Sequence, residues 1–244
     1  MRILLINDYV NELGGAERIA LDTKSLLEEK GHKVKIFGSH KKENFGSFLS
    51  RWFSVKYYHQ TKKLIENFKP DIVHCHNFSR EVSPSPLLAA KGLGVPTVIT
   101  LHDFGMYCPN TWGVFSDGKV CKKGYNILCP FYQCRAARVG YHYIPYHLLK
   151  WLKVCLHRFM IKRYVDYFIC PSKKSKELMQ KTLEIPDEKI TYLPNFVEFG
   201  DGRANLDRIN PKQFLFVGRM RKGKGVDVAI KAMDYLVKKE KLDD

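Results

Sequence analysis

Short runs of apolar and β-branched residues alternate along this chain with longer amphipathic segments. Six runs predict β-strands, over residues 3–6, 33–37, 71–76, 97–102, 166–170 and 190–193. Several are apolar throughout, as is typical of parallel strands buried on both faces. Helices are predicted between them, over residues 17–30, 47–68, 84–92, 141–164 and 173–183. Because strand and helix alternate, we expect an α/β fold: a doubly wound parallel sheet with right-handed crossovers, as in a Rossmann-like domain.

The pattern changes after Pro194-Asn195. Residues 197–211 are rich in Gly, Asp, Asn and Pro, which is typical of a linker. A new strand is predicted over 213–217, then a basic glycine-rich turn over 218–225 and a helix over 226–239. We therefore expect an N-terminal domain over 1–194, a linker over 195–211 and the first βα unit of a second Rossmann-like domain over 212–244. A complete second domain would need on the order of 100 more residues, so the chain is expected to be truncated.

The chain is strongly basic. Its 244 residues include 41 Lys and Arg against 25 Asp and Glu, a formal net charge of +16, and a hydrophobic content of 45% excludes disorder. The excess charge indicates anionic partners: nucleic acid, a phosphorylated small molecule or an anionic membrane face. The start of the chain has no signal-peptide apolar region, and no apolar run approaches ~18 residues. With seven cysteines, an odd number, these features predict a soluble or peripheral cytoplasmic protein.

Two glycine-containing loops that follow predicted strands are candidates for binding phosphate. Gly14-Gly15 lies at the start of a helix, where free backbone amides bind anions. A flexible helix start explains these glycines equally well, and the G-x-G-x-x-G dinucleotide fingerprint is absent. The 218–225 loop adds Arg219, which can hold phosphate oxygens through two parallel hydrogen bonds, and Lys224, a compact positive charge. It is not a Walker A loop, because no Ser or Thr follows the lysine, and a solvated basic turn is the alternative.

Several short motifs occur in the order and register typical of one enzyme family. They are Gly14-Gly15-Ala16-Glu17, His74-Cys75-His76, His102-Asp103, Pro171-Ser172, Pro194-Asn195, and Gly218-Arg219 with Lys224-Gly225. Together they resemble glycosyltransferase family 4, retaining enzymes of the GT-B fold, over essentially the whole chain. The resemblance implies two Rossmann-like domains across a cleft, of which the N-terminal one binds the acceptor and the C-terminal one a nucleoside-diphosphate-sugar. It implies transfer of that sugar to a saccharide or lipid-linked acceptor, most commonly in bacterial cell-surface polysaccharide synthesis.

The resemblance also implies roles for individual residues. Arg219 and Lys224 would hold the donor diphosphate and neutralise the charge of the leaving group, so that catalysis requires no metal cofactor. Gly14 and Gly15 would approach the diphosphate from the opposite wall, and His102 would lie near the reacting sugar. The acceptor side would comprise Asp103, His76 and Glu17. No side-chain nucleophile is expected, because retention in this family is attributed to front-face substitution in which the leaving phosphate helps to deprotonate the acceptor.

Two features of the sequence limit this interpretation. A histidine at the end of a strand is often a satisfied core residue, which is the alternative for His74, His76 and His102. Family members also carry two glutamates seven residues apart further along the second domain. The sequence ends before them, and Glu240 belongs to the opening helix. We therefore expect the chain alone to have negligible transferase activity and weak affinity for nucleotide-sugars.

Two other classes of function are weighed against the transferase. The first is a noncatalytic acceptor- or membrane-binding half, which would work only with a separately encoded C-terminal partner. The second is a nucleotide-dependent oxidoreductase or epimerase, which is disfavoured by the absent glycine fingerprint and by the cationic turn.

A long insertion over 104–134 carries four of the seven cysteines: Cys108, Cys121, Cys129 and Cys134. A loop of this length needs something to order it, and four thiolates could bind a structural zinc ion tetrahedrally. The spacings contain no Cys-x-x-Cys, so free thiols or labile disulfides remain alternatives.

The segment from Arg135 to Val165 is basic, aromatic and free of acidic residues. Its apolar stripe at helical spacing comprises Leu148, Leu152, Cys155, Leu156, Phe159 and Met160. Such a helix suits the surface of an anionic membrane, on its cytoplasmic face, although a stripe packed in the core is the equal alternative. Nucleic acid is disfavoured as a partner, because no known nucleic-acid-binding module fits the sequence.

Overall fold

The structure, a computed structural model, describes residues 1–11, 14–40, 48–78, 81–109, 113, 115, 119–131, 144–197, 214–218, 220 and 224–240. It divides into two compact units, Met1–Val197 and Glu198–Asp244. The boundary falls close to the predicted start of the linker at 195.

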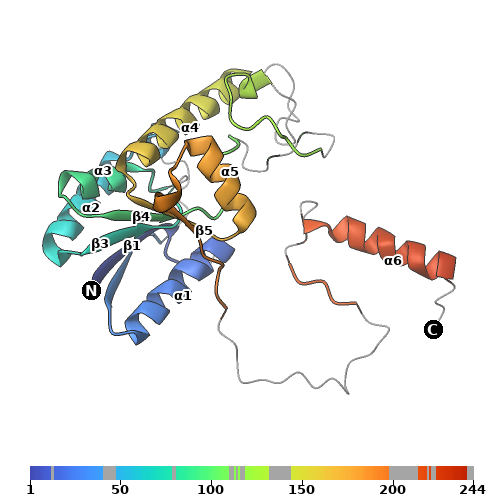
Figure 1. The fold of residues 1–244 in the computed structure, drawn as a ribbon, viewed down its shortest axis with the longest axis horizontal. Coiled ribbons are helices and arrows are strands. Elements are labelled where there is room, and N and C mark those ends of the chain that lie inside the picture. The colour runs from blue at the N-terminus through green and yellow to red at the C-terminus, as the bar shows by residue number, and fades with distance from the viewer. Residues whose placement is uncertain are drawn as a thin grey trace. The chain divides into compact units, whose positions relative to one another are not determined.

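Six parallel strands form one sheet in the order β2-β1-β3-β4-β5-β6 (Figure 1). They are β1 (Arg2–Tyr9), β2 (Lys33–Ser39), β3 (Ile72–Cys75), β4 (Thr97–Thr100), β5 (Tyr167–Cys170) and β6 (Ile190–Tyr192). All six predicted strands are present, so the predicted doubly wound parallel α/β sheet is confirmed. Because β3 and β4 end earlier than predicted, His76 and His102 lie just beyond the strands, at the carboxyl edge of the sheet.

Five helices belong to the described part of the first unit: α1 (Gly15–Glu29), α2 (Val55–Phe68), α3 (Ser85–Gly92), α4 (Ile144–Tyr164) and α5 (Lys173–Leu183). Short 3₁₀ turns are η1 (Phe48–Arg51), η2 (Cys129–Phe131) and η4 (Asp187–Lys189). The helix predicted over 47–68 is divided into η1 and α2, because Ser54 caps α2 by accepting a hydrogen bond from the Tyr57 amide at 3.3 Å. None of the helices over the described residues is both long and apolar enough to cross a membrane.

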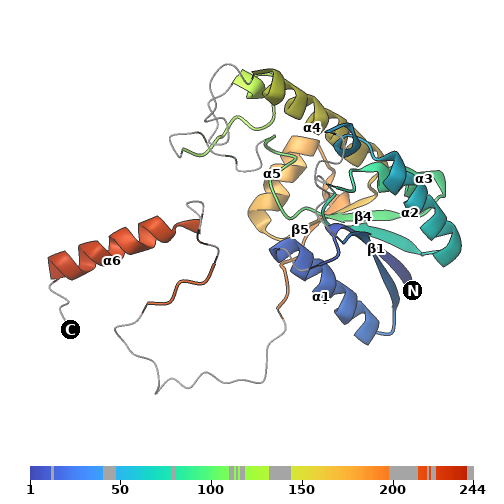
Figure 2. The same ribbon diagram turned by 180° about the vertical axis from the view of Figure 1, so that it is seen from behind.

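The helices cover the two faces of the sheet unequally (Figures 1 and 2). Alternate strand residues, such as Leu4 and Ile99, pack with residues of α2, α3, α4 and α5 in the larger core cluster. Ile3 and Leu5 point to the other face and pack with Leu27 of α1. The division follows from the strand order. The connection from β1 to β2 runs one way across the sheet and the later ones run the other way, so right-handed crossovers place α1 alone on its face.

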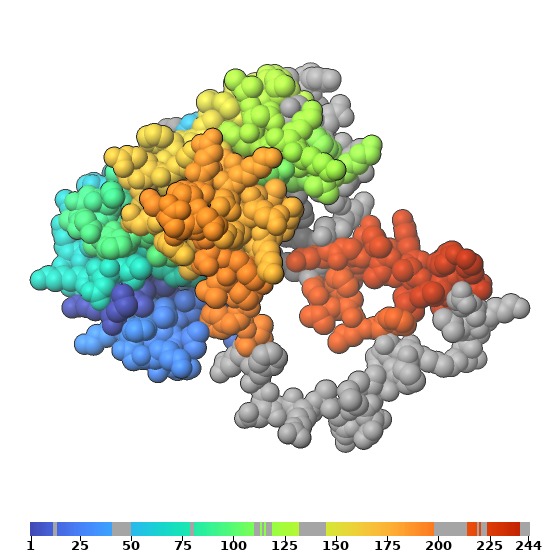
Figure 3. Space-filling view, viewed as in Figure 1, coloured from blue at the N-terminus to red at the C-terminus, as the bar shows by residue number. Residues whose placement is uncertain are grey.

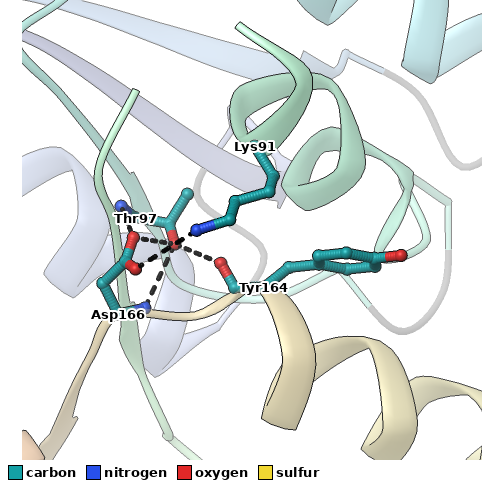
Figure 4. A network of polar contacts seen from close by, with 4 residues as sticks. All are labelled: Lys91, Thr97, Tyr164 and Asp166. Carbon is teal, nitrogen blue, oxygen red and sulfur yellow. Dashed lines mark hydrogen bonds and ion pairs between the residues drawn. The ribbon is translucent and has the colours of Figure 1, made fainter. Parts of the chain in front are cut away.

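A polar network joins β4 and β5 at the amino edge of the sheet (Figure 4). The Asp166 carboxylate accepts a hydrogen bond from the Thr97 amide at 2.8 Å, and the Thr97 hydroxyl donates to the Tyr164 carbonyl at 2.6 Å. Lys91 Nζ lies 3.9 Å from Asp166 Oδ1, and both side chains are about half exposed. The hydrogen bonds therefore do more than the ion pair to fix this edge, which lies away from the carboxyl ends of the strands.

The second unit contains α6 (Val226–Glu240) over its described residues. The strand predicted over 213–217 is not formed over residues 214–217. Phe214 and Val217 are 71% and 85% exposed. An apolar run becomes a strand only where a neighbouring strand pairs with its backbone, and no such strand lies among the described residues of this unit.

Candidate functional site

The carboxyl edge of the sheet is where a ligand site is expected. The strand order reverses between β1 and β3, because the connection after β1 leads to one side of the sheet and the connection after β3 to the other. Open α/β sheets bind ligands in the crevice at such a switch point. The segments that follow β1, β3 and β4 bring Gly14, His76 and His102 to this edge.

The glycine pair opens α1 without a side-chain cap. Gly14 is the N-cap, with φ and ψ both at −175°, and no side chain caps the first turn. A Cβ placed on Gly15 would meet no atom within 4 Å, so the space in front of this helix start is open. Glu17 lies in the first turn and is half-buried. The arrangement fits the predicted anion site, whose free amides point out of the helix.

Buried polar residues at the end of β1 hold the segment that follows β3. Asn7 Oδ1 accepts a hydrogen bond from the Asn77 amide at 3.0 Å. Asp8 Oδ1 accepts from the amides of Glu81 and Val82 at 2.9 and 3.0 Å. Asn7 and Asp8 were not predicted to be part of the site. The signal that could have identified them is the presence of polar residues at the end of a buried apolar strand. The two side chains fix the floor of the switch point.

Three imidazoles form a stack beside this floor. The His74 and His76 ring centroids are 4.4 Å apart, and those of His76 and His102 are 5.2 Å apart, with the latter rings within 16° of parallel. His76 Nδ1 lies 2.9 Å from His102 Nε2, and His74 Nε2 lies 2.8 Å from Thr100 Oγ1. His76 is 3% exposed, and its Nε2 has no hydrogen-bond partner among the described residues.

Burial keeps all three imidazoles neutral. It lowers the pKa of His74 to about 4, with a smaller contribution from His102, and it lowers the pKa of His102 to about 4. Burial, with His74 and His102 nearby, also lowers the pKa of His76 well below its ordinary value. A neutral imidazole carries one N–H, so one nitrogen of the His76–His102 contact donates and the other accepts. Near pH 7 the cluster can exchange hydrogen bonds with hydroxyl groups but carries no charge.

A cavity of about 110 Å³ opens beside the imidazoles. His76, His102 and Asp103 line it from the ends of β3 and β4, and residues of α4 line it from above the sheet. The structure therefore brings together three residues that the sequence predicts to be part of the site. Gly14, Gly15 and Glu17 are not among the residues that line this cavity.

The α4 residues of the cavity were not predicted to be part of a site. They are Lys150, Lys153, Val154, His157 and Ile161. Each lies three or four residues from another member of the set, which places them on one stripe of the helix. The spacing can be read from the sequence, but the sequence analysis places the basic residues of this segment, Lys150 and Lys153 among them, on a surface that faces solvent or a membrane. Of the predicted apolar stripe, Leu148 and Phe159 are 42% and 62% exposed, whereas Met160 is buried.

The predicted zinc site is not supported by the cysteines that the structure describes. Cys108, Cys121 and Cys129 are free thiols. Among the described residues, no group of three or more His, Cys, Asp or Glu side chains could hold a metal ion. Cys134 lies outside the described residues.

Side-chain packing holds the described residues of the insertion. The Tyr107 hydroxyl donates to the Cys121 carbonyl at 2.7 Å, and the rings of Tyr125 and Trp151 stack 5.8 Å apart, 4° from parallel. The Arg158 guanidinium donates to the carbonyls of Met106 and Thr182. These contacts tie the described residues of the insertion to α4, and α4 to α5.

The cationic residues of the second unit stay predictions. Lys224 is exposed and directly precedes Gly225, whose φ of +77° is in the left-handed region that favours glycine. Arg219 lies outside the described residues.

Comparison with known proteins identifies one family. The model described as Glycosyltransferase Family 4 matches residues 13–200. No curated protein matches the chain.

Several solved structures resemble the chain. They include UDP-GlcNAc 2-epimerase from Neisseria meningitidis (16% identity, TM-score 0.42, covering 79% of this chain and 45% of that chain) and MurG from Acinetobacter baumannii (11% identity, TM-score 0.42, covering 85% and 47%). A third is Alr3699/HepE of Anabaena in complex with UDP (14% identity, TM-score 0.40, covering 81% and 45%). The chain thus spans less than half the length of these structures.

Proposed function

The chain belongs to glycosyltransferase family 4, and from this premise we propose that it transfers a sugar from a nucleoside-diphosphate-sugar to a saccharide or lipid-linked acceptor, with retention of configuration. The observation that carries the proposal is the cavity at the carboxyl edge, lined by His76 and His102 within the region that the family model matches. We further propose that this occurs at the cytoplasmic face of a membrane, in the synthesis of cell-surface polysaccharide or glycoconjugate.

The first unit supplies the acceptor side in this proposal. His102 lies against the reacting sugar and the acceptor hydroxyl, and its neutral imidazole exchanges hydrogen bonds with them without adding charge. His76 supports it through the 2.9 Å contact between the two rings. Asp103 is the third residue of the acceptor side, and its Oδ1 accepts a hydrogen bond from the Gly105 amide at 2.7 Å. Glu17, in the first turn of α1, belongs to the acceptor side by family resemblance alone.

The donor side combines two sets of phosphate contacts. Gly14 and Gly15 leave the amides of α1 free to meet one face of the diphosphate. Arg219 and Lys224 neutralise the charge that develops as the nucleoside diphosphate leaves, a role that other enzymes give to a metal ion. The leaving phosphate itself then helps to remove the proton of the acceptor hydroxyl, so no side-chain nucleophile is needed.

The test supplies the chain with a separately expressed C-terminal donor-binding half from another family 4 enzyme, a panel of UDP- and GDP-sugars, and saccharide and lipid-extract acceptors. We expect a glycoside whose anomeric configuration matches that of the donor. His102→Ala should lower its rate about 100-fold or more, because the variant removes a contact made in the transition state. The matched control, His59→Ala, removes an exposed histidine of α2 and should leave the rate unchanged. Epimerisation or hydrolysis of the donor without transfer would overturn the assignment.

A second candidate is a noncatalytic half that needs a separate partner. It is favoured by the second unit, whose described residues comprise one helix, α6, and no paired strand with which it could form a sheet. Robust transfer by the purified chain alone would refute this candidate and also the expectation of negligible activity.

We also propose that α4 and the neighbouring insertion dock on an anionic bilayer. In Figure 3 the atoms of α4 and of residues 119–131 form a continuous part of the surface. Exposed apolar side chains on these segments are Leu148, Leu149, Leu152, Phe159, Ile127, Leu128 and Phe131. Charge complementarity favours an anionic surface as the occupant, because the sequence from 118 to 165 contains ten Lys or Arg and no Asp or Glu.

Co-sedimentation with vesicles tests this proposal. We expect binding to phosphatidylglycerol vesicles and little binding to phosphatidylcholine vesicles. Leu152→Ser/Phe159→Ser should weaken the binding about tenfold, because two apolar side chains leave the interface. Leu26→Ser is the control, since Leu26 is exposed on α1. Equal binding to both lipids, or equal loss in the control, would contradict the proposal.

A further inference from the structure

We propose that Glu81 binds hydroxyl groups of the saccharide acceptor, and that Asp8 and Tyr9 position its carboxylate for this contact. The inference rests on the proposed function and names a residue that recognises the acceptor of that reaction. None of the three residues was predicted from the sequence to be part of the site.

The first step is the position of Glu81. It lies between β3 and α3, in the segment that follows β3 at the carboxyl edge of the sheet. Asn77 of the same segment lines the cavity, and the adjacent residues Asn7 and Asp8 accept hydrogen bonds from the amides of Asn77 and Glu81. Glu81 itself is not among the residues that line the cavity. It therefore lies at the switch point between β1 and β3, where open α/β sheets bind ligands.

The second step is that Glu81 is held at two points. Asp8 Oδ1 accepts a hydrogen bond from its amide at 2.9 Å, and the Tyr9 hydroxyl donates to its Oε1 at 2.8 Å. Asp8 and Tyr9 are only 2% and 3% exposed. A glutamate between two elements normally samples several rotamers, and a ligand that orders it must offset the lost conformational entropy. Here buried partners fix both the backbone and the side chain before a ligand binds.

The third step is the oxygen that these contacts leave free. Tyr9 contacts Oε1 of Glu81, whereas Oε2 has no hydrogen-bond partner among the described residues and is not one of their side-chain atoms sealed from solvent. No described Lys, Arg or His side chain forms an ion pair with this carboxylate. In a chain with 41 Lys and Arg against 25 Asp and Glu, an ordered carboxylate without a cationic partner is best explained by a ligand.

The fourth step is the chemistry that a free carboxylate oxygen selects. It only accepts hydrogen bonds, so the ligand must donate one, and its negative charge repels phosphate and carboxylate groups. Saccharide hydroxyls donate hydrogen bonds and carry no charge. His76 and His102, which line the cavity at the same edge of the sheet, are neutral and also exchange hydrogen bonds with hydroxyls. The polar groups at this edge therefore favour a neutral polyhydroxyl acceptor.

The first experiment measures binding of the labelled 244-residue chain, without donor, to an array of neutral bacterial oligosaccharides. We expect at least one glycan to bind, and Glu81→Met to weaken that binding about tenfold or more, because both acceptor oxygens are removed. The matched control, Glu66→Met, makes the same change at an exposed position of α2 and should stay within about twofold. Thermal melts verify that each variant folds.

A double-mutant cycle separates positioning from a structural role of Tyr9. Tyr9→Phe keeps the ring but not the hydroxyl, and should weaken glycan binding about threefold. In the Glu81→Met background the same change should have no further effect, because the carboxylate that Tyr9 orients is already absent. The double variant also removes both ends of the buried contact, so neither polar group is left without a partner. A threefold loss in both backgrounds would show that Tyr9 acts on the fold and not through Glu81, and would overturn the positioning role.

The second experiment is the transfer assay with the separately expressed C-terminal half. Glu81→Met should raise the KM for the acceptor about tenfold and leave the KM for the donor within about twofold, because the contact is made with the acceptor alone. The inference is wrong if no neutral glycan binds the chain, if Glu66→Met loses as much affinity as Glu81→Met, or if the KM for the donor rises instead.

Failure of this inference is distinguishable from failure of the proposed function. Transfer that is unaffected by Glu81→Met would leave the transferase intact and refute the role of Glu81. Glycan binding that depends on Glu81, without any transfer, would support the role of Glu81 and refute the transferase.

Discussion

The sharpest test of the buried imidazoles is the pH dependence of stability in the variant His157→Gln. The histidine has a pKa of about 3 in the folded chain and ~6.5 when unfolded. Between these values the unfolded state binds more protons, so His157 makes the folded state lose stability as the pH falls from ~6.5 towards 3. Integrating the two titrations gives a loss of about 2 kcal/mol between pH 7 and pH 5 from this one residue. Glutamine does not titrate, and its amide can donate to the Arg51 carbonyl as Nε2 does.

The measurement is the free energy of unfolding from urea titrations at pH 7, 6 and 5, followed by tryptophan fluorescence. We expect His157→Gln to be somewhat less stable than the wild type at pH 7. Its loss of stability on going to pH 5 should be about 2 kcal/mol smaller than that of the wild type. The control His59→Gln removes an exposed histidine and should parallel the wild type. Curves for His157→Gln and wild type that stay parallel would refute the conclusion that His157 is buried and neutral.

Four further substitutions test the backbone and the amino edge. Gly15→Ala has room for its Cβ, so we expect an unchanged melting temperature. In the transfer assay with the separately expressed C-terminal half, the KM for the donor should rise about tenfold, because the added methyl group obstructs the start of α1. Gly38→Ala should cost about 3 kcal/mol in urea unfolding, because its Cβ would lie 2.0 Å from the Asn7 carbonyl oxygen; wild-type stability would contradict this packing. Asp166→Ala should lower the free energy of unfolding by about 1–3 kcal/mol, because its hydrogen bonds with Thr97 are lost. Lys91→Ala removes only the long ion pair with Asp166 and should lower it by under about 0.5 kcal/mol. Equal losses in the two variants would refute this ranking.

The sheet could be predicted because two-sided burial leaves a direct signal in the sequence. β1 reads as a continuous apolar run because helices cover both of its faces, as with Leu4 in the larger cluster and Leu5 in the smaller. The histidines that follow β3 and β4 could be placed at one edge for the same reason, since carboxyl ends of parallel strands meet. The strand predicted over 213–217 shows the limit of this reasoning, because an apolar run becomes a strand only where a partner pairs with it.

The part of the site contributed by α4 could not be predicted in the same way. From its residue type alone, a lysine is expected on the solvent-exposed surface. Only the position of the helix over the sheet shows that Lys150 and Lys153 line a cavity. The insertion presents the same difficulty. Its cysteines suggested a metal, whereas contacts of Tyr107, Tyr125 and Arg158 hold its described residues. The stacking of Tyr125 on Trp151 and the two hydrogen bonds of Arg158 join residues 24 to 52 positions apart, so they leave no local pattern in the sequence.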